Sequence, residues 1–191
     1  KSLTLIGGYD STFTDPPYEN FMWVNIHPPA GARGVYIDNN ANVTIRNFYF
    51  YGGNAPLSGV GVYVNQGSLT LQGSTFSQNA GSNCTALDFR DGVLQIEDST
   101  FFFNTASGGC AAICAVQAES GSLIRETELS ANIADGSTGM LLNTSNIAVE
   151  RNMFWENSAI SNTVAGIRVD MGVYTLTNNV FIRNYASEAP T

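Results

Sequence analysis

The sequence has little positive charge and few of the side chains that common hydrolytic enzymes use. Its 191 residues contain 8 Lys and Arg against 16 Asp and Glu, which gives a formal net charge of -8. So few cations cannot neutralise a run of phosphates, and we expect no binding to nucleic acid. The single histidine, His27, lies in the Pro- and Gly-rich segment NIHPPAG. Ser-His-Asp or Cys-His catalysis would have to use this turn residue, which makes it a poor candidate.

Long apolar runs are also missing. No stretch of 18 or more apolar residues occurs, so no membrane-spanning helix is expected. The chain begins at Lys1 without a visible signal peptide. We therefore expect it to be a processed or excised piece of a larger parent protein with other domains.

A short motif recurs along the chain, with an aromatic residue three positions before an asparagine. It reads FSQN at 76–79, FFFN at 101–104, FWEN at 154–157 and FIRN at 181–184, with a weaker copy, LSAN, at 129–132. The first position of the motif forms a column that begins one repeat earlier: Phe50, Phe76, Phe101, Leu129, Phe154 and Phe181. A period of about 26 residues indicates a solenoid whose coils stack on one another.

Within each repeat, apolar residues alternate with others at period two, and no helical period is sustained. This pattern predicts an all-β fold, a single-stranded right-handed parallel β-helix (solenoid) of about seven coils, with neighbouring strands about 4.8 Å apart. We expect one β-helix domain over 1–191. Residues 1–33 would form an N-terminal coil with an insertion or cap around 9–21, and 34–189 would form six regular coils.

The asparagines of the motif are interpreted as a structural ladder. An asparagine tolerates the left-handed conformation of a tight corner, and stacked carboxamides satisfy each other's donors and acceptors. The ladder comprises Asn79, Asn104, Asn132, Asn157 and Asn184. A second polar column is expected to behave in the same way: Ser74, Ser99, Thr127, Asn152 and Asn179.

Three cysteines fall within two consecutive repeats. Cys84 and Cys110 are 26 residues apart, which is one coil, and they occupy similar turns. Stacking would bring them near bridging distance, so both a disulfide between them and two separate thiols agree with the spacing. A disulfide would fit an extracellular or periplasmic setting. Cys114 falls in an inward column with Leu87 and Met140, which predicts a buried free thiol.

The segment FFFNTASGGCAAICA at 101–115 resembles the F-x-x-N and G-G-A-[ILV] repeats of chlamydial polymorphic outer membrane proteins. The pattern is similar to that of right-handed β-helix proteins of the pectin-lyase-like superfamily. LTLIGGYDSTFTDP at 3–16 resembles the stretch that often opens such domains. The resemblance covers nearly the whole chain, but full GGA triplets are absent from most coils. It implies a bacterial protein, secreted or on the cell surface, that serves as an adhesin, a passenger segment or a carbohydrate-recognising stalk.

One outward column carries aromatic side chains. The position after the core aromatic places Tyr51, Phe102 and Trp155 outside if the alternation holds, with small serines between them. Exposed aromatic rings along a rod suit stacking on sugar rings or docking onto a partner. Local packing against a neighbouring loop or domain is the alternative.

A charged strip follows the repeat as well. Glu97, Arg125 and Glu150 alternate in sign at one position, which predicts ion pairs between coils. At the next position, Asp98 and Glu126 are like charges one coil apart, an arrangement that can raise one pKa or hold Ca²⁺.

Arg151 continues this column, and Arg125 and Arg151 are expected to neutralise the two acids. By resemblance, enzymes of this fold need Ca²⁺-binding carboxylates with an Arg or Lys base, or clustered acids. We find no acidic triad in the sequence. Asp98, Glu126 and Arg151 are weak catalytic candidates, and Asp88 and Asp91 form another loose acidic pair. We therefore expect a charged surface rather than an active or metal site, with no cofactor.

The sequence favours a non-catalytic extracellular segment that acts as an adhesin, stalk or carbohydrate-binding module. Its expected partner is a polysaccharide or a glycan of a host or cell surface. A polysaccharide-active β-helix enzyme, lyase or hydrolase, or a fragment of one, is the alternative. Three convergent carboxylates would favour the enzyme, whereas an outward strip with Tyr51, Phe102 and Trp155 would favour binding.

Overall fold

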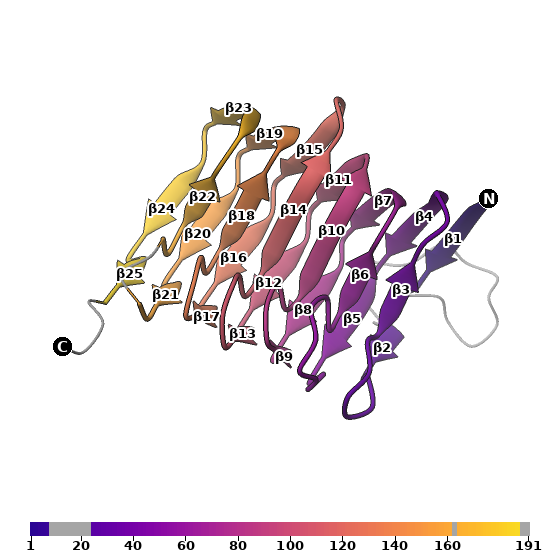
Figure 1. Cartoon of the computed structure of the whole chain (residues 1–191), viewed down its shortest axis with the longest axis horizontal. Coiled ribbons are helices and arrows are strands. Elements are labelled where there is room, and N and C mark those ends of the chain that lie inside the picture. The colour runs from indigo at the N-terminus through magenta and orange to yellow at the C-terminus, as the bar shows by residue number, and fades with distance from the viewer. Residues whose placement is uncertain (8–23, 162–163, 188–191) are drawn as a thin grey trace.

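The computed structural model describes residues 1–7, 24–161 and 164–187. These residues form short parallel strands that stack coil upon coil along the long axis of the molecule (Figure 1). No helix of the described residues has the length and apolarity needed to cross a membrane. The predicted all-β parallel solenoid is confirmed.

Two sheets of seven strands form two sides of the solenoid. Sheet A contains β1 (Ser2–Ile6), β4 (Ala41–Arg46), β7 (Gly67–Gln72), β11 (Leu94–Glu97), β15 (Ser122–Arg125), β19 (Ser145–Glu150) and β23 (Gly172–Thr177). Sheet B contains β2 (Val24–Ile26), β5 (Phe48–Tyr51), β8 (Thr75–Ser77), β12 (Thr100–Phe102), β16 (Glu128–Ser130), β20 (Met153–Trp155) and β24 (Val180–Ile182).

Two smaller sheets complete each coil. Sheet C contains β3 (Val35–Ile37), β6 (Val62–Val64), β10 (Leu87–Gly92), β14 (Ile113–Ala118), β18 (Met140–Asn143) and β22 (Ile167–Val169). Sheet D contains β9 (Ala80–Gly81), β13 (Thr105–Ala106), β17 (Ile133–Ala134), β21 (Ser158–Ala159) and β25 (Tyr185–Ala186).

A regular coil passes through sheets A, B, D and C before it returns to sheet A. Six complete turns run from β1 to β23 in the described residues, and β23 begins a seventh. The predicted count of about seven coils is therefore one more than the number of complete turns. The earlier coil expected from residue 2 is present, since β1 pairs with β4 in register from Ser2 opposite Asn42. The insertion expected around 9–21, with its cap, lies outside the described residues.

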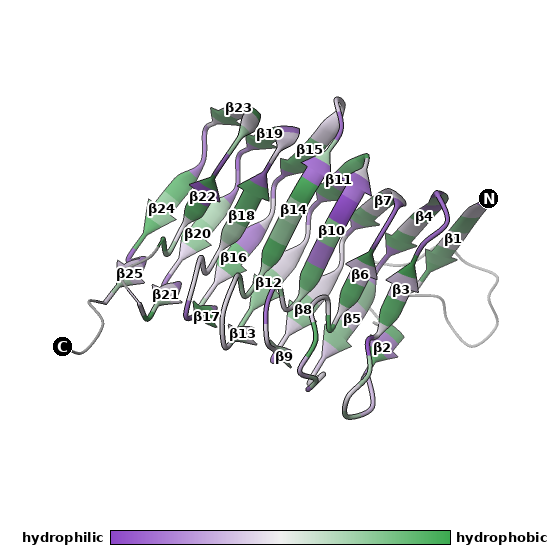
Figure 2. Ribbon diagram, viewed as in Figure 1, coloured by the Kyte–Doolittle hydropathy of each residue, from purple (hydrophilic) through white to green (hydrophobic). Residues whose placement is uncertain are grey.

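The predicted aromatic column fills the core. Adjacent phenyl rings stack with centroids 4.6 Å apart for Phe50 and Phe76 and 4.7 Å apart for Phe76 and Phe101. Hydrophobic segments recur at the same place in successive coils (Figure 2). Rings that stack in a fully buried column add to the free energy gained by removing their apolar surface from water.

The asparagine ladder forms as predicted. Asn132 illustrates each rung: its Nδ2 donates to Asn157 Oδ1 at 2.9 Å and to the carbonyl of Phe101 at 2.9 Å. Its Oδ1 accepts both the backbone N–H and the side-chain Nδ2 of Asn104. The second polar column also links coils, for instance where Asn152 Nδ2 donates to Asn179 Oδ1 at 3.0 Å. Buried carboxamides are thus fully used, which avoids the cost of unpaired buried polar groups.

The left-handed conformation expected at these corners belongs to a different residue. Each ladder asparagine follows a residue with φ between 49° and 55°, namely Gln78, Phe103, Ala131, Glu156 and Arg183. A second left-handed column, with φ between 49° and 58°, lies between sheets A and B: Asn47, Gly73, Asp98, Glu126, Arg151 and Asn178. The ladder asparagines are therefore selected by their inward hydrogen bonds, while the preceding residue makes the bend.

The cysteine prediction is wrong in both parts. The disulfide joins Cys84 to Cys114, and Cys110 is the free, buried thiol. Ile113, not Cys114, occupies the inward column, opposite Leu87 and Met140. Cys114 therefore points to the outer side of sheet C and reaches Cys84 in the loop that covers it. Cys110 Sγ instead lies 3.2 Å from the carbonyl oxygen of Ile113, and burial raises the pKa of its thiol to about 12.

A peptide map under non-reducing conditions will test this pairing, with a Cys84–Cys114 link expected. Replacing Cys84 and Cys114 together by Ala is expected to lower the free energy of unfolding by about 3.5 kcal/mol, because the closed loop is long. The Cys110→Ala variant is the control and should keep the link. A Cys84–Cys110 link in the wild-type protein would contradict the assignment.

Candidate binding face and acidic cluster

The outer side of sheet B carries the predicted aromatic column. Parallel pairing places Tyr51, Ser77, Phe102, Ser130, Trp155 and Ile182 at one position of six consecutive coils. The serines at the second and fourth positions are buried, at 1% and 7% exposure. Trp155 is 39% exposed, whereas Tyr51 and Phe102 are partly buried. The large rings therefore stand at every second coil, about 10 Å apart.

Each ring has its own surroundings. The imidazole of His27 stacks on Tyr51 at 4.9 Å, and its Nδ1–H donates to the Tyr51 carbonyl oxygen at 2.9 Å. His27 follows β2, so it extends the column by one coil. Phe102 meets Phe103 edge to face at 5.4 Å. Trp155 has no aromatic neighbour among the described residues, so it offers the least obstructed ring.

An open groove of about 810 Å³ follows the outer side of sheet D, one corner away from the aromatic column. Its floor consists of small residues such as Ala80, Gly81 and Ala106. Ile160 and Asp135 contribute to its lining at the C-terminal coils. The face that carries the aromatic rings is thus bordered by a shallow channel that runs from coil to coil.

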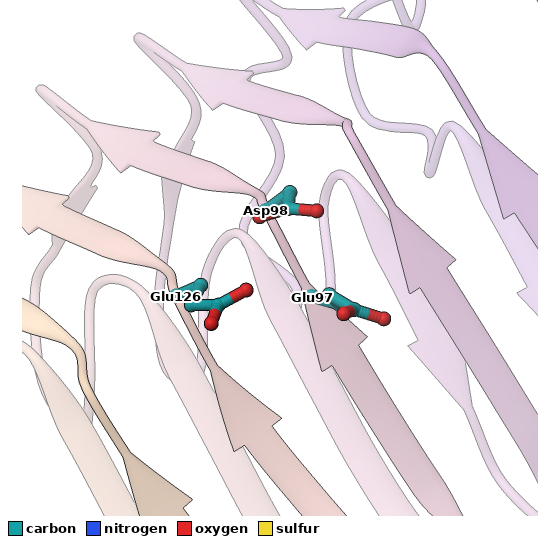
Figure 3. Close-up of side chains that lie close together, drawn as sticks. All are labelled: Glu97, Asp98 and Glu126. Carbon is teal, nitrogen blue, oxygen red and sulfur yellow. The ribbon is translucent and has the colours of Figure 1, made fainter.

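Three carboxylates converge on the corner between sheets A and B (Figure 3). Glu97 ends β11, Asp98 follows it, and Glu126 follows β15 one coil later. One carboxylate oxygen of each residue lies within 4.8 Å of the others. The expectation that no acidic triad forms is therefore wrong. Glu97 supplies the third carboxylate. It ends β11, and the turn of the chain at this corner brings its side chain close to Asp98 and Glu126.

Two arginines balance most of this negative charge. Arg125 pairs with Glu97, and Arg151 pairs with Glu126 at 2.6 Å. The predicted link between Arg125 and Glu150 is replaced by a contact of Glu150 with Arg151 at 3.8 Å. Exposed pairs of this kind contribute little to stability. The five charged groups around Asp98 carry a net charge of about -1 once both arginines are counted.

The pKa values of Asp98 and Glu126 are shifted in opposite directions from their ordinary values. Desolvation, followed by the charges of Glu97 and Glu126, raises the pKa of Asp98 above its ordinary value. The hydrogen bond from Arg151 lowers the pKa of Glu126. Asp98 is thus protonated more readily than an ordinary aspartate, and Glu126 less readily than an ordinary glutamate. All three carboxylates remain accessible to solvent, and only oxygen ligands are offered to a cation.

The structure also contains a second group of polar residues that was largely not predicted from the sequence. On the outer side of sheet C, Asp88 is fully buried and pairs with Arg90, with Nε 2.6 Å from Oδ1. Arg33 lies over the ring of Tyr63 at 4.4 Å. The ring of Tyr63 in turn stacks on Tyr36 at 5.5 Å. The alternation of inward and outward residues along β6 and β10 predicts that these side chains lie outside. The sequence pattern does not indicate that Asp88 would be buried there.

A family model described as a right-handed beta helix region matches residues 30–188. The chain belongs to the right-handed β-helix family. No significantly similar curated protein and no significantly similar solved structure was found. Membership establishes the architecture, and any assignment of function has to come from the outer columns.

The charge balance at the corner generates a pH-dependent prediction. Arg151→Ala is expected to raise the pKa of Glu126, measured by NMR titration of the side-chain carboxyl carbon. In the wild-type protein the lowered pKa favours folding above the ordinary pKa of glutamate, and this contribution disappears as the pH falls through the lowered value. Arg168→Ala is the control, because Arg168 lies on sheet C and pairs with Asp170 rather than with the cluster. An unchanged Glu126 titration in Arg151→Ala would show that the ion pair does not form in solution.

Proposed function

We propose that the protein is a non-catalytic, extracellular β-helix module that binds an extended glycan along sheet B. One observation carries this proposal: aromatic rings occupy every second position of a single outward column. Sugar rings present apolar C–H faces that stack on aromatic side chains, while their hydroxyls remain in water. A polymer laid parallel to the solenoid axis would meet Tyr51, Phe102 and Trp155 in turn.

The spacing of the rings supports an extended polymer as the ligand. Neighbouring strands are about 4.8 Å apart, so rings on alternate coils repeat every 10 Å or so. This is comparable to the length of a disaccharide unit in an extended β-linked chain. The first and last rings are four coils apart, about 19 Å. A ligand that contacts all three must be a short oligosaccharide or longer, rather than a single sugar.

The setting outside the cell is supported by the covalent chemistry and by resemblance. Cys84 and Cys114 form a disulfide, which persists mainly in oxidising compartments. The F-x-x-N and glycine-rich repeats resemble those of chlamydial polymorphic outer membrane proteins and of the pectin-lyase-like superfamily. We infer a bacterial protein, secreted or displayed on the cell surface, in which this module serves as an adhesive or carbohydrate-binding stalk.

One observation favours a second candidate, a polysaccharide-cleaving enzyme. Glycosidases pair an acid of raised pKa with a carboxylate that stays ionised. Asp98 and Glu126 show these opposite biases and lie in one cluster. The binding proposal is preferred because two of the three carboxylates are already bound to arginines. Release of reducing ends from a polysaccharide, abolished by Asp98→Asn, would support cleavage instead.

Trp155→Ala is expected to weaken glycan binding about tenfold, because it removes the most exposed stacking ring. A glycan array will identify ligands, and calorimetry with oligosaccharides of increasing length will measure affinity. Phe102→Ala should weaken binding less, and Tyr51→Ala least, since His27 already covers part of that ring.

Tyr185→Ala is the matched control, because this tyrosine is 64% exposed but lies on sheet D, outside the column. Affinity should increase with oligosaccharide length until all three rings are contacted. Glycan binding that Trp155→Ala leaves unchanged, or that Tyr185→Ala weakens equally, would contradict the assignment of this column. No binding to any glycan on the array would overturn the proposed function.

A further inference from the structure

A separate hollow lies at the corner where sheet C turns toward sheet A. Its volume is about 260 Å³, and three consecutive coils line it, with the residues Tyr63, Asn65, Gln66, Arg90, Asp91 and Gln117. All six side chains carry a polar group, and five of them end in a planar amide, carboxylate or guanidinium. Convergent polar groups in a concave site can fix the orientation of a bound ligand.

Local backbone geometry produces this hollow. Strand β6 stops at Val64, whereas β10 and β14 continue and pair again through Gly92 and Ala118. The continuation forces positive φ angles on Asp91 (139°) and Gln117 (56°). Gln117 has the left-handed φ of the other corners, which lies between 49° and 60°, whereas Asp91 departs from it at 139°. Holding Asp91 in this conformation costs about 1–3 kcal/mol. Both residues contribute to the lining of the hollow.

Arg90 is held rigidly at the base of the site. Its Nη2 donates to Asp88 Oδ2 at 2.8 Å, and its Nε lies 2.6 Å from Asp88 Oδ1. These contacts use one edge of the guanidinium and leave the N–H groups of Nη1 for another partner. Asp88 is completely buried, so the guanidinium charge is compensated from below. The arginine therefore acts as an oriented donor more than as a free cation.

Two further residues are fixed by neighbours from the preceding coil. The ring of Tyr63 stacks on Tyr36, and the guanidinium of Arg33 lies over both rings, 4.4 Å from the Tyr63 centroid and 5.8 Å from the Tyr36 centroid. Asn65 donates its Nδ2 to Asp38 Oδ1 at 3.1 Å, which orients its own Oδ1 as an acceptor. A site whose groups are already oriented loses little conformational entropy when a ligand binds.

The remaining polar groups have no internal role. Within the described part of the chain, the side chains of Gln66, Asp91 and Gln117 make no hydrogen bond to another residue. We propose that the hollow binds one neutral pyranose unit, with the amides and Asp91 bonding to adjacent hydroxyls and Arg90 donating to a ring or hydroxyl oxygen. Each sugar hydroxyl both donates and accepts, which matches this mixture of donors and acceptors.

Charge selects a neutral ligand. Asp88 compensates Arg90, and Asp91 adds an uncompensated carboxylate at the rim, so a phosphate or a uronate would be repelled. The volume suits a single sugar ring rather than a polymer segment. This site lies on sheet C, whereas the aromatic column lies on sheet B, so either can fail without the other.

The test is a titration of the ¹⁵N-labelled, disulfide-bonded protein with methyl glycosides of glucose, galactose, mannose and N-acetylglucosamine. Galacturonate and inorganic phosphate are the anionic probes. At least one neutral glycoside should shift the backbone amides of Asn65, Asp91 and Gln117. Gln117→Ala is expected to weaken that binding about fivefold, the effect of one hydrogen bond.

Gln78→Ala is the matched control, since Gln78 is also an exposed corner glutamine, with φ 55° against 56° for Gln117. It should leave the affinity unchanged. The proposal is overturned if no neutral glycoside shifts the amides of the hollow, or if Gln117→Ala and Gln78→Ala behave alike. Tighter binding of galacturonate or phosphate would also overturn it.

Discussion

Every other feature of this protein depends on the parallel pairing of each strand with the strand one coil away. The pairing keeps equivalent residues about 4.8 Å apart, so each side chain meets its own counterpart above and below. A buried polar group must then be satisfied within its column, as the carboxamides of Asn104, Asn132 and Asn157 are. A buried ring stacks on a ring for the same reason. Repetition in the sequence is the consequence of this geometric constraint.

The constraint explains how much of the fold is predictable from sequence. The aromatic and asparagine columns were assigned correctly because only one face of each strand tolerates them. The prediction failed at β14, where Ile113, Cys114, Ala115 and Val116 are all apolar and period two gives no preferred phase. The one-residue error placed Cys114 inside, and with it the wrong disulfide. Register is specified only where polar and apolar residues alternate.

The outer surface was predicted less completely. The aromatic column of sheet B follows directly from alternation, so Tyr51, Phe102 and Trp155 were placed correctly in one outward column. The convergence of Glu97 with Asp98 and Glu126 depends on how the left-handed corner folds, and sequence spacing contains no such information. The hollow beside Arg90 forms because β10 and β14 extend beyond the position at which β6 ends. Strand length at one corner is a local outcome of backbone geometry, which a repeat pattern does not encode.

Side chains in the core and in the outer aromatic column repeat at different intervals along the solenoid, and this difference bears on function. The core repeats with every coil, because a gap in a buried column leaves a cavity. The aromatic column of sheet B repeats with every second coil, and buried serines occupy the coils between. Because the serines are buried, small and large side chains also pack against one another in this column, and only the large rings remain partly exposed to a ligand. An array of rings with twice the strand spacing can bind an elongated, repeating polymer, whereas a compact ligand would contact only one ring.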